Sequence, residues 1–319
     1  MIRYFVPFLI LTVLMASCSP PAAIESNPEK SNVLFMVVLG IAQDGGYPQS
    51  GCYAPHCMRA WNDPSLKRKA VALGLVDPKT KKKWLFEATP DIREQLFELQ
   101  KIAPDSLYEF AGIFLTHGHM GHYTGLMHLG KEVMNTQGIN VYAMPRMQEY
   151  LSTNGPWSQL GSINNIVLQP LKDSTMVELT DDISVVPFTV PHRDEYTEVV
   201  GFQITGPGKS LIFIPDIDKW EKWDVNLAAI HERWDYVFVD ATFFRDGELP
   251  GRDMSKILHP FVTESYVYFN SIPSAKKANV HFIHFNHTNP LLIDGSKEQK
   301  EVKANGFNYA FEGQVVDLE

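Results

Sequence analysis

Three histidines fall within six residues directly after one of the most apolar stretches of the chain. The apolar segment Gly112–Thr116 leads into His117-Gly118-His119-Met120-Gly121-His122. A lone histidine is usually a structural residue. Three histidines at spacings of two and three favour a divalent metal site, because imidazole nitrogen is a preferred ligand of zinc and similar ions. The two glycines let the backbone curl so that the rings can converge.

Apolar strands alternate with helical segments along the chain. Strands are predicted at 33–39, 71–76, 84–86, 112–116, 140–143, 163–168, 183–190, 199–205, 210–214, 236–239 and 280–285, with helices over 91–101, from about 123, over 220–231 and over 263–270. This alternation is typical of layered α/β architecture, and the hairpins at 77–80 and 206–209 imply mixed sheets. No linker divides residues 33–319, which are predicted to form one domain.

The first 32 residues are interpreted as an export signal and a tether. Arg3 precedes an apolar run over 4–16, which is shorter than the about 20 residues that a membrane-spanning helix needs. The segment Leu14–Cys18 resembles a bacterial lipobox, so residues 1–17 are predicted to be a signal peptide and Cys18 a lipidated N-terminus. An ordinary signal peptide cleaved nearby is the alternative. The proline-containing stretch 18–32 is predicted to be a flexible tether, which makes the protein an exported lipoprotein anchored to a bacterial membrane and facing the periplasm or the cell surface.

The composition limits the partners. The chain has 319 residues, 45% of them hydrophobic, and 28 Lys and Arg against 37 Asp and Glu, for a net charge of −9. The hydrophobic fraction is enough for a large core and excludes a mainly disordered chain. The acidic balance argues against nucleic acid as a partner, since such binders cluster Lys and Arg. A small molecule is therefore the expected substrate.

Further candidate residues follow later strands. His192 follows the strand over 183–190, Asp216 follows 210–214, Asp240 follows 236–239, and His284 lies at the end of 280–285. Together with the histidine-rich loop, and in this order, they resemble the pattern of the metallo-β-lactamase superfamily. The resemblance implies a four-layer αβ/βα sandwich with two mixed β-sheets.

The same resemblance implies a set of metal ligands. It assigns to a first metal His117, His119 and His192, to a second metal His122 and His284, and to the bridging position Asp216. The chain departs from the family at Gly121, where the family has a ligating aspartate; the missing oxygen could come from Asp218, His287 or water. One tightly held zinc ion and a weaker second ion are therefore expected, with iron or manganese as alternatives. An aspartate introduced at position 121 is expected to raise occupancy of the second position.

A narrower resemblance is to the pyrroloquinoline quinone synthesis B branch of the superfamily. It rests on residues 39–49, on Cys52 and Cys57, and on the segments 89–93 and 288–290. The branch has a three-cysteine cluster that can hold structural zinc, but Ala54 stands at the middle position here and His56 lies nearby. A zinc site formed by Cys52, His56 and Cys57, which lacks a fourth ligand in the sequence, and a disulfide between the two cysteines are equal alternatives.

The segment Val239–Phe243 is similar to a motif of tRNase Z-like phosphodiesterases. Downstream, His259 stands where their second catalytic histidine is expected, so Asp240 could hold His259 protonated for work on a leaving group. The alternative is that Asp240 caps a turn and His259 is a surface residue.

The function predicted from these residues is metal-dependent hydrolysis. A divalent ion on three histidines lowers the pKa of its bound water toward about 7, and the resulting hydroxide can attack an ester, amide or phosphodiester bond. The predicted catalytic residues are Asp216, Asp240 and His259. The quinone-synthesis resemblance implies an alternative, iron-dependent oxidation of a tyrosine-derived precursor. A second alternative is a surface protein that binds metal without catalysis.

Overall fold

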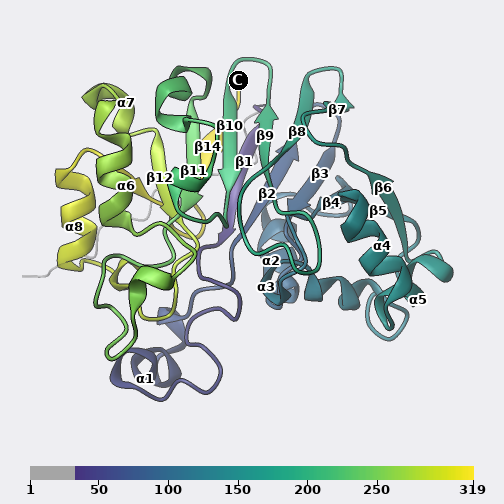
Figure 1. The fold of residues 1–319 in the computed structure, drawn as a ribbon. Helices are drawn as coiled ribbons and strands as arrows, with labels where there is room; N and C mark the ends of the chain where they lie inside the picture. Colours follow the sequence, from purple (N-terminus) through teal and green to yellow (C-terminus); the bar gives the residue numbers. More distant parts are fainter. Residues whose placement is uncertain (1–32) are drawn as a thin grey trace, which may run out of the picture. The chain divides into compact units, whose positions relative to one another are not determined.

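The computed structural model describes residues 33–319, and the predicted signal peptide, lipidated Cys18 and tether lie outside this range. Two mixed seven-stranded sheets form the centre, as Figure 1 shows. The first sheet has the order β14-β1-β2-β3-β4-β5-β6, with strands β1 (Phe35–Gly40), β2 (Ala72–Asp77), β3 (Lys82–Phe86), β4 (Glu109–Phe114), β5 (Ile139–Ala143), β6 (Ile166–Pro170) and β14 (Val315–Asp317). The second has the order β13-β12-β11-β10-β9-β8-β7, with strands β7 (Val177–Thr180), β8 (Ile183–Thr189), β9 (Val200–Thr205), β10 (Ser210–Ile214), β11 (Tyr236–Asp240), β12 (Val280–Ile283) and β13 (Asn308–Tyr309).

Most helices cover the outer faces of the two sheets, whereas α1 lies beyond their lower edge in Figure 1. Those of the first half are α1 (Pro55–Asn62), α2 (Ile92–Ile102), α3 (Met120–Tyr123), α4 (Pro145–Thr153) and α5 (Trp157–Ser162), and those of the second half are α6 (Val262–Tyr268), α7 (Ser274–Lys277) and α8 (Lys297–Ala304). Short 3₁₀ turns occupy 64–66, 124–129, 220–222, 227–233, 254–256, 269–271 and 290–292. This is the predicted αβ/βα sandwich. None of the helices within residues 33–319 is long and apolar enough to cross a membrane.

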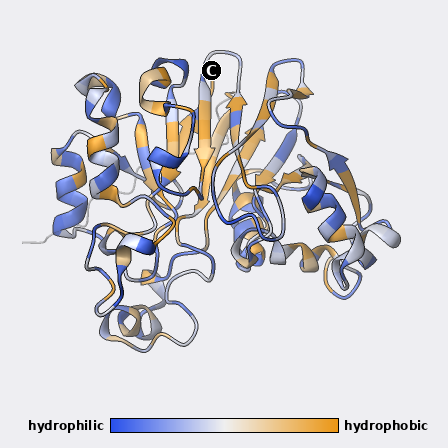
Figure 2. Ribbon diagram, viewed as in Figure 1, coloured by the Kyte–Doolittle hydropathy of each residue, from blue (hydrophilic) through white to orange (hydrophobic). Residues whose placement is uncertain are grey.

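The main core lies between the sheets. Strands β1 and β2 are buried along their whole length, as expected for strands covered on both faces. Phe86 and Phe114 of the first sheet each lie with their ring centroids 5.6 Å from Phe202 of the second. Figure 2 shows hydrophobic residues concentrated on these strands. Burying rings of this size is worth several kcal/mol each, on the order of 3–5 when one is truncated to alanine.

The strand directions bring ten strand ends to one edge of the sandwich. Strands β1, β3, β4, β5 and β6 run the same way in the first sheet, and β8, β10, β11, β12 and β13 run the same way in the second. Beyond the strands, a bridge between Ala42 and Phe285 joins the continuation of β1 to that of β12. Ligand sites of open α/β sheets lie at such carboxyl edges.

Two predicted helices are wrong in type. The one predicted from about 123 is a 3₁₀ stretch over 124–129 that follows the short α3. The segment 220–231 forms two 3₁₀ stretches, over 220–222 and 227–233. The break has a local cause, because the side chain of Asn226 accepts a hydrogen bond from the backbone of Ala229 and starts a new helical turn.

Candidate metal centre

Each group of the candidate site follows the carboxyl end of a strand. The residues, in chain order, are Asp44 after β1, Glu87 after β3, His117, His119 and His122 after β4, His192 after β8, Asp216 after β10, Asp240 at the end of β11, and His284 after β12. His259 comes from the loop before α6. The structure therefore brings together at this edge all of the predicted catalytic residues and the ligands assigned to the two metals.

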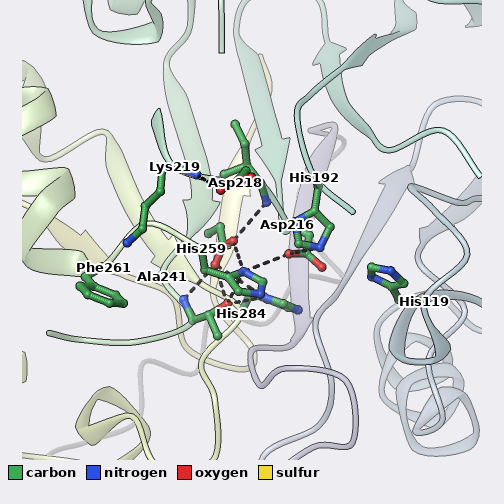
Figure 3. Close-up of polar contacts among 12 residues, drawn as sticks. His119, His192, Asp216, Asp218, Lys219, Ala241, His259, Phe261 and His284 are labelled. Atoms are coloured by element: carbon green, nitrogen blue, oxygen red, sulfur yellow. Dashed lines mark hydrogen bonds and ion pairs between the residues drawn. The ribbon is translucent and has the colours of Figure 1, made fainter. Parts of the chain in front are cut away.

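The first cluster consists of His117, His119, His192 and Asp216, whose donor atoms all lie within 4.8 Å of one another. The Nε2 atoms of His117 and His192 lie 3.3 Å from opposite oxygens of the Asp216 carboxylate. Ligands of one tetrahedral zinc ion stand about 3.4 Å apart, since each lies about 2.1 Å from the metal. Figure 3 shows Asp216 next to His192, with His119 to the side. The cluster has the spacing of a metal site.

The second cluster consists of His122, His284 and Asp44, whose donor atoms also lie within 4.8 Å of one another. The Nε2 atom of His122 lies 3.6 Å from Asp216, which places this carboxylate between the two clusters. Behind the cluster, Glu87 lies 3.4 Å from Nδ1 of His122, and the hydroxyl of Thr242 lies 2.9 Å from Nδ1 of His284. Partners of this kind orient the opposite ring nitrogen toward a metal.

Buried polar atoms without hydrogen-bond partners test whether a metal fits. Within residues 33–319, such atoms include both ring nitrogens of His122 and of His192, Nε2 of His284 and Oδ1 of Asp216. Leaving a buried polar group unsatisfied costs about 1–3 kcal/mol, so several at one place need a common partner. Divalent cations at the two clusters would satisfy one ring nitrogen of each histidine and the Asp216 oxygen. The donor set of imidazoles and carboxylates suits zinc, iron or manganese.

Three residues around the second cluster have positive φ angles. Asp44, Glu87 and His284 have φ angles of +34°, +78° and +68°, in the left-handed region that non-glycine residues rarely adopt. Strain of this kind costs on the order of 1–3 kcal/mol per residue and concentrates at functional sites. All three residues are on the strand ends that surround His122.

Asp240, Thr242 and His259 form a third group. Nδ1 of His259 lies 2.8 Å from Asp240 and 3.1 Å from Asp216, and the hydroxyl of Thr242 donates to Asp240 over 2.7 Å. Burial alone would lower the pKa of His259, but the two carboxylates outweigh it and raise the pKa to about 10. His259 is thus held against Asp240 and is not an isolated surface residue.

The charges of the cluster stabilise one another. Burial would raise the pKa of Asp216, but His192, His259 and His284 hold it well below the usual range. Burial and the neighbouring His122 lower the pKa of His117. A neutral imidazole and an ionised carboxylate are the forms that ligate a metal.

Two substitute ligands considered from the sequence lie elsewhere. The carboxylate of Asp218 accepts from the backbone of Lys219 and from Nζ of Lys222, both over 2.7 Å, and Figure 3 shows it beside Lys219. His287 lies against His56, with ring centroids 5.6 Å apart. Asp44 and Glu87 were not identified as site residues from the sequence. The signal that could have found Asp44 is its place directly after a buried strand, the position shared by the other candidates.

Cys52 and Cys57 are paired as a disulfide, with Cα atoms 6.0 Å apart. The donor atoms of His56 and His287 lie within 4.8 Å of these sulfurs. The fourth ligand that the sequence lacked is therefore present as His287, from the loop after β12. These four residues are called the Cys₂His₂ group below.

A cavity of about 510 Å³ opens beside the centre. His259 and Asp44 form part of its wall on the metal side, and Arg193, Arg252 and Lys256 contribute cationic side chains. Phe243, Leu249 and Ile257 add an apolar wall. Arg193 and Lys256 each have a carboxylate neighbour, Glu195 at 3.5 Å and Asp253 at 3.2 Å. Arg252 has none within 4 Å in the part of the chain that the structure describes.

The model of the beta-lactamase superfamily domain matches residues 82–284, more than half of the chain. The protein belongs to this superfamily, and its fold is the metallo-β-lactamase fold.

Within the superfamily, the chain is similar to coenzyme PQQ synthesis protein B. The protein of that name from Methylorubrum populi is 27% identical over 311 residues, covering 89% of this chain and 100% of the relative. The crystal structure of Zn²⁺-bound PqqB from Methylobacterium extorquens has a TM-score of 0.74 at 25% identity, covering 89% of this chain and all of that one. A diphosphatase of the PhnP family, at 20% identity and a TM-score of 0.62, covers 90% of this chain and 98% of its own and shares the fold.

Proposed function

We propose that the protein is a zinc-dependent hydrolase of a small anionic ester, with phosphodiesters as the preferred class. The observation that carries the proposal is a cavity with three cationic side chains set against a cluster of buried imidazoles and carboxylates without partners. The chain as a whole carries a net charge of −9. Cationic side chains at a cleft of such a molecule serve to attract an anion.

His117, His119, His192 and Asp216 would hold the first ion. When bound, the ion would supply a Lewis acid and lower the pKa of a coordinated water to about 7. The zinc-bound structure of the similar PqqB protein supports zinc as the metal.

The residues around the ion have separate tasks in this proposal. Arg252 and Lys256 bind the negative charge of the substrate, and Phe243 lies against its apolar part. His259 keeps a proton through its contact with Asp240. Its Nε2 atom makes no hydrogen bond with any residue of 33–319 and is free to donate to a leaving oxygen.

The reaction class is tested with three chromogenic substrates on zinc-loaded protein: bis(p-nitrophenyl) phosphate, p-nitrophenyl acetate and a β-lactam. We expect the diester to be hydrolysed with the highest kcat/KM. Arg252→Ala should raise KM for the diester and leave the neutral ester unchanged. Arg245→Ala is the matched control, because Arg245 pairs with Glu301 over 2.7 Å and does not line the cavity. Zinc-loaded protein that turns over none of the three would contradict the proposal.

His119→Ala tests the dependence on metal. His119 is an expected ligand, and losing even an outer partner of a ligand costs about 10- to 100-fold in metal affinity. We expect zinc content and diester hydrolysis to fall together. His128→Ala is the control, since His128 lies in the next turn of the chain and outside every candidate metal group. Unchanged zinc in the His119 variant would remove the basis of the first metal position.

A second candidate function is iron-dependent oxidation of a tyrosine-derived cofactor precursor. The similarity to coenzyme PQQ synthesis protein B over the whole length of that relative favours it. Iron content and oxygen uptake with candidate precursors discriminate the two reactions. Stoichiometric metal with neither reaction would instead indicate a metal-binding protein without catalysis.

A further inference from the structure

Position 121 has no side chain to offer to the second metal position, and the structure shows what fills the space. A Cβ atom built on Gly121 would lie 2.5 Å from Oδ1 of Asp44 and in hard contact with its Cα atom. Asp44 therefore occupies the volume into which a side chain at 121 would extend. It reaches there from the segment after β1, whereas Gly121 belongs to helix α3, which follows β4.

The carboxylate of Asp44 faces the second cluster. Its Oδ1 atom lies 3.7 Å from Nε2 of His122, and its donor atom groups with those of His122 and His284. Both histidines are fully buried, and their Nε2 atoms have no hydrogen-bond partner among residues 33–319. A partner shared by the three residues would explain these atoms.

The loop that carries Asp44 is fixed to the loop that carries His284. The backbone of Gln43 donates to Phe285 over 2.8 Å, and that of Phe285 donates to Ile41 over 2.8 Å. Gly46 closes a turn by donating to Gln43 over 2.9 Å. Aspartate tolerates the left-handed backbone at position 44 better than most residues. The backbone that carries the carboxylate is thus fixed relative to the loop that carries His284.

We propose that Asp44 is the carboxylate ligand of the second metal position, replacing the side chain absent at Gly121. With His122, His284 and the shared Asp216, it gives the second ion a donor set that includes two carboxylates. Negative ligands are what two neighbouring dications need to offset their repulsion. The second position then holds its ion firmly, and Gly121 is required so that Asp44 can reach it.

The proposal rests on metal loading as described under Proposed function, but not on hydrolysis. Its test is the zinc stoichiometry and affinity of the full-length protein, by elemental analysis and by calorimetric titration of metal-free protein with zinc. Asp44→Asn and Asp44→Ala are compared with the unmodified chain. Asp218→Asn is the matched control, because Asp218 is the neighbouring aspartate that binds lysines instead. Thermal unfolding verifies that each variant is folded. Asparagine preserves the side-chain shape of aspartate and its tolerance of the left-handed backbone at position 44.

We expect both Asp44 variants to lose about 10- to 100-fold in affinity for one ion and to retain the other. Asp218→Asn should bind as the unmodified protein does. The proposal is overturned if Asp44→Ala binds every ion as tightly as the unmodified chain. It is also overturned if the variant and the unmodified protein each hold a single ion at the centre with the same affinity. Two bound ions without turnover of any substrate would refute the hydrolase and leave the assignment of Asp44 intact.

Discussion

The side chain of Asp44 limits which residue types fit at position 121. The expectation that an aspartate at 121 would raise metal occupancy meets a steric obstacle, because a Cβ atom there would lie 2.3 Å from Cα of Asp44. Gly121→Ala should therefore destabilise the fold by about 1–3 kcal/mol, the usual cost of overpacking, and should weaken the second ion by displacing Asp44. Urea unfolding and zinc titration measure the two effects.

Gly161→Ala is the control for this prediction. Nothing lies within 4 Å of a Cβ atom at position 161, in helix α5, so alanine should be neutral or stabilising by up to about 1 kcal/mol. If Gly121→Ala behaves like Gly161→Ala in both measurements, the close approach of Asp44 to Gly121 is not a constraint in solution.

The residues of the site differ in how far the sequence reveals them. Three histidines in six residues form a pattern that packing rarely produces, so His117, His119 and His122 could be identified from the sequence. Asp44 and Glu87 are single acids, and their place after a buried strand is the one local signal that they carry. Only the strand order, which places β3 beside β4 and β1 two strands beyond β3, with all three directed to one edge, brings them to the metal centre.

At the scale of the element, strand β12 carries a buried histidine outside the metal centre. Burial lowers the pKa of His281 to about 4; its ring stacks on Phe238 with centroids 4.8 Å apart. In the unfolded chain the pKa is about 6.5, so the unfolded state binds more protons between these values. The free energy of unfolding should therefore fall as pH drops from about 6.5 to 4, by up to about 3 kcal/mol from this residue.

Urea unfolding at pH 7.5, 6 and 5 tests this expectation. His281→Gln removes the titrating group, so the stability of the unmodified protein relative to the variant should decrease toward low pH. If the unfolding free energies of the unmodified protein and of His281→Gln change with pH in parallel over this range, His281 is not kept neutral by the sheet.

The Cys₂His₂ group joins α1 to the loop after β12, two elements far apart in the chain. Two thiolates and two imidazoles are a structural zinc set, so reducing the disulfide should create a zinc site. We expect reduced protein to bind one more zinc ion than oxidised protein. His287→Ala and His56→Ala should each abolish this extra ion and lower the melting temperature of the reduced form. An equal zinc count before and after reduction would mean that the group serves only as a disulfide.

At the scale of the whole molecule, the alternation of strands and helices was enough to predict a layered α/β fold, but not its details. Edge strands β7, β13 and β14 have two to four residues and carry no run long enough to detect. The hairpin turns and buried strands were correctly placed because Gly, Pro and apolar runs determine them locally. How the two sheets face each other depends on contacts such as Phe86 with Phe202, which separate segments of the sequence do not reveal.

One prediction for the whole molecule concerns the N-terminal segment, which lies outside the described residues. Small residues lead to Cys18, and a proline-containing stretch follows up to Asn32, so we expect signal cleavage before Cys18 and lipidation of its thiol. Stable membrane attachment takes more than one acyl chain, which a diacylated cysteine provides. Mass spectrometry of membrane fractions should find acylated Cys18 as the first residue.

Cys18→Ser should release the protein from the membrane while its zinc content remains unchanged. A soluble protein that retains the residues before Cys18 would contradict the prediction and leave the fold and the metal centre as assigned.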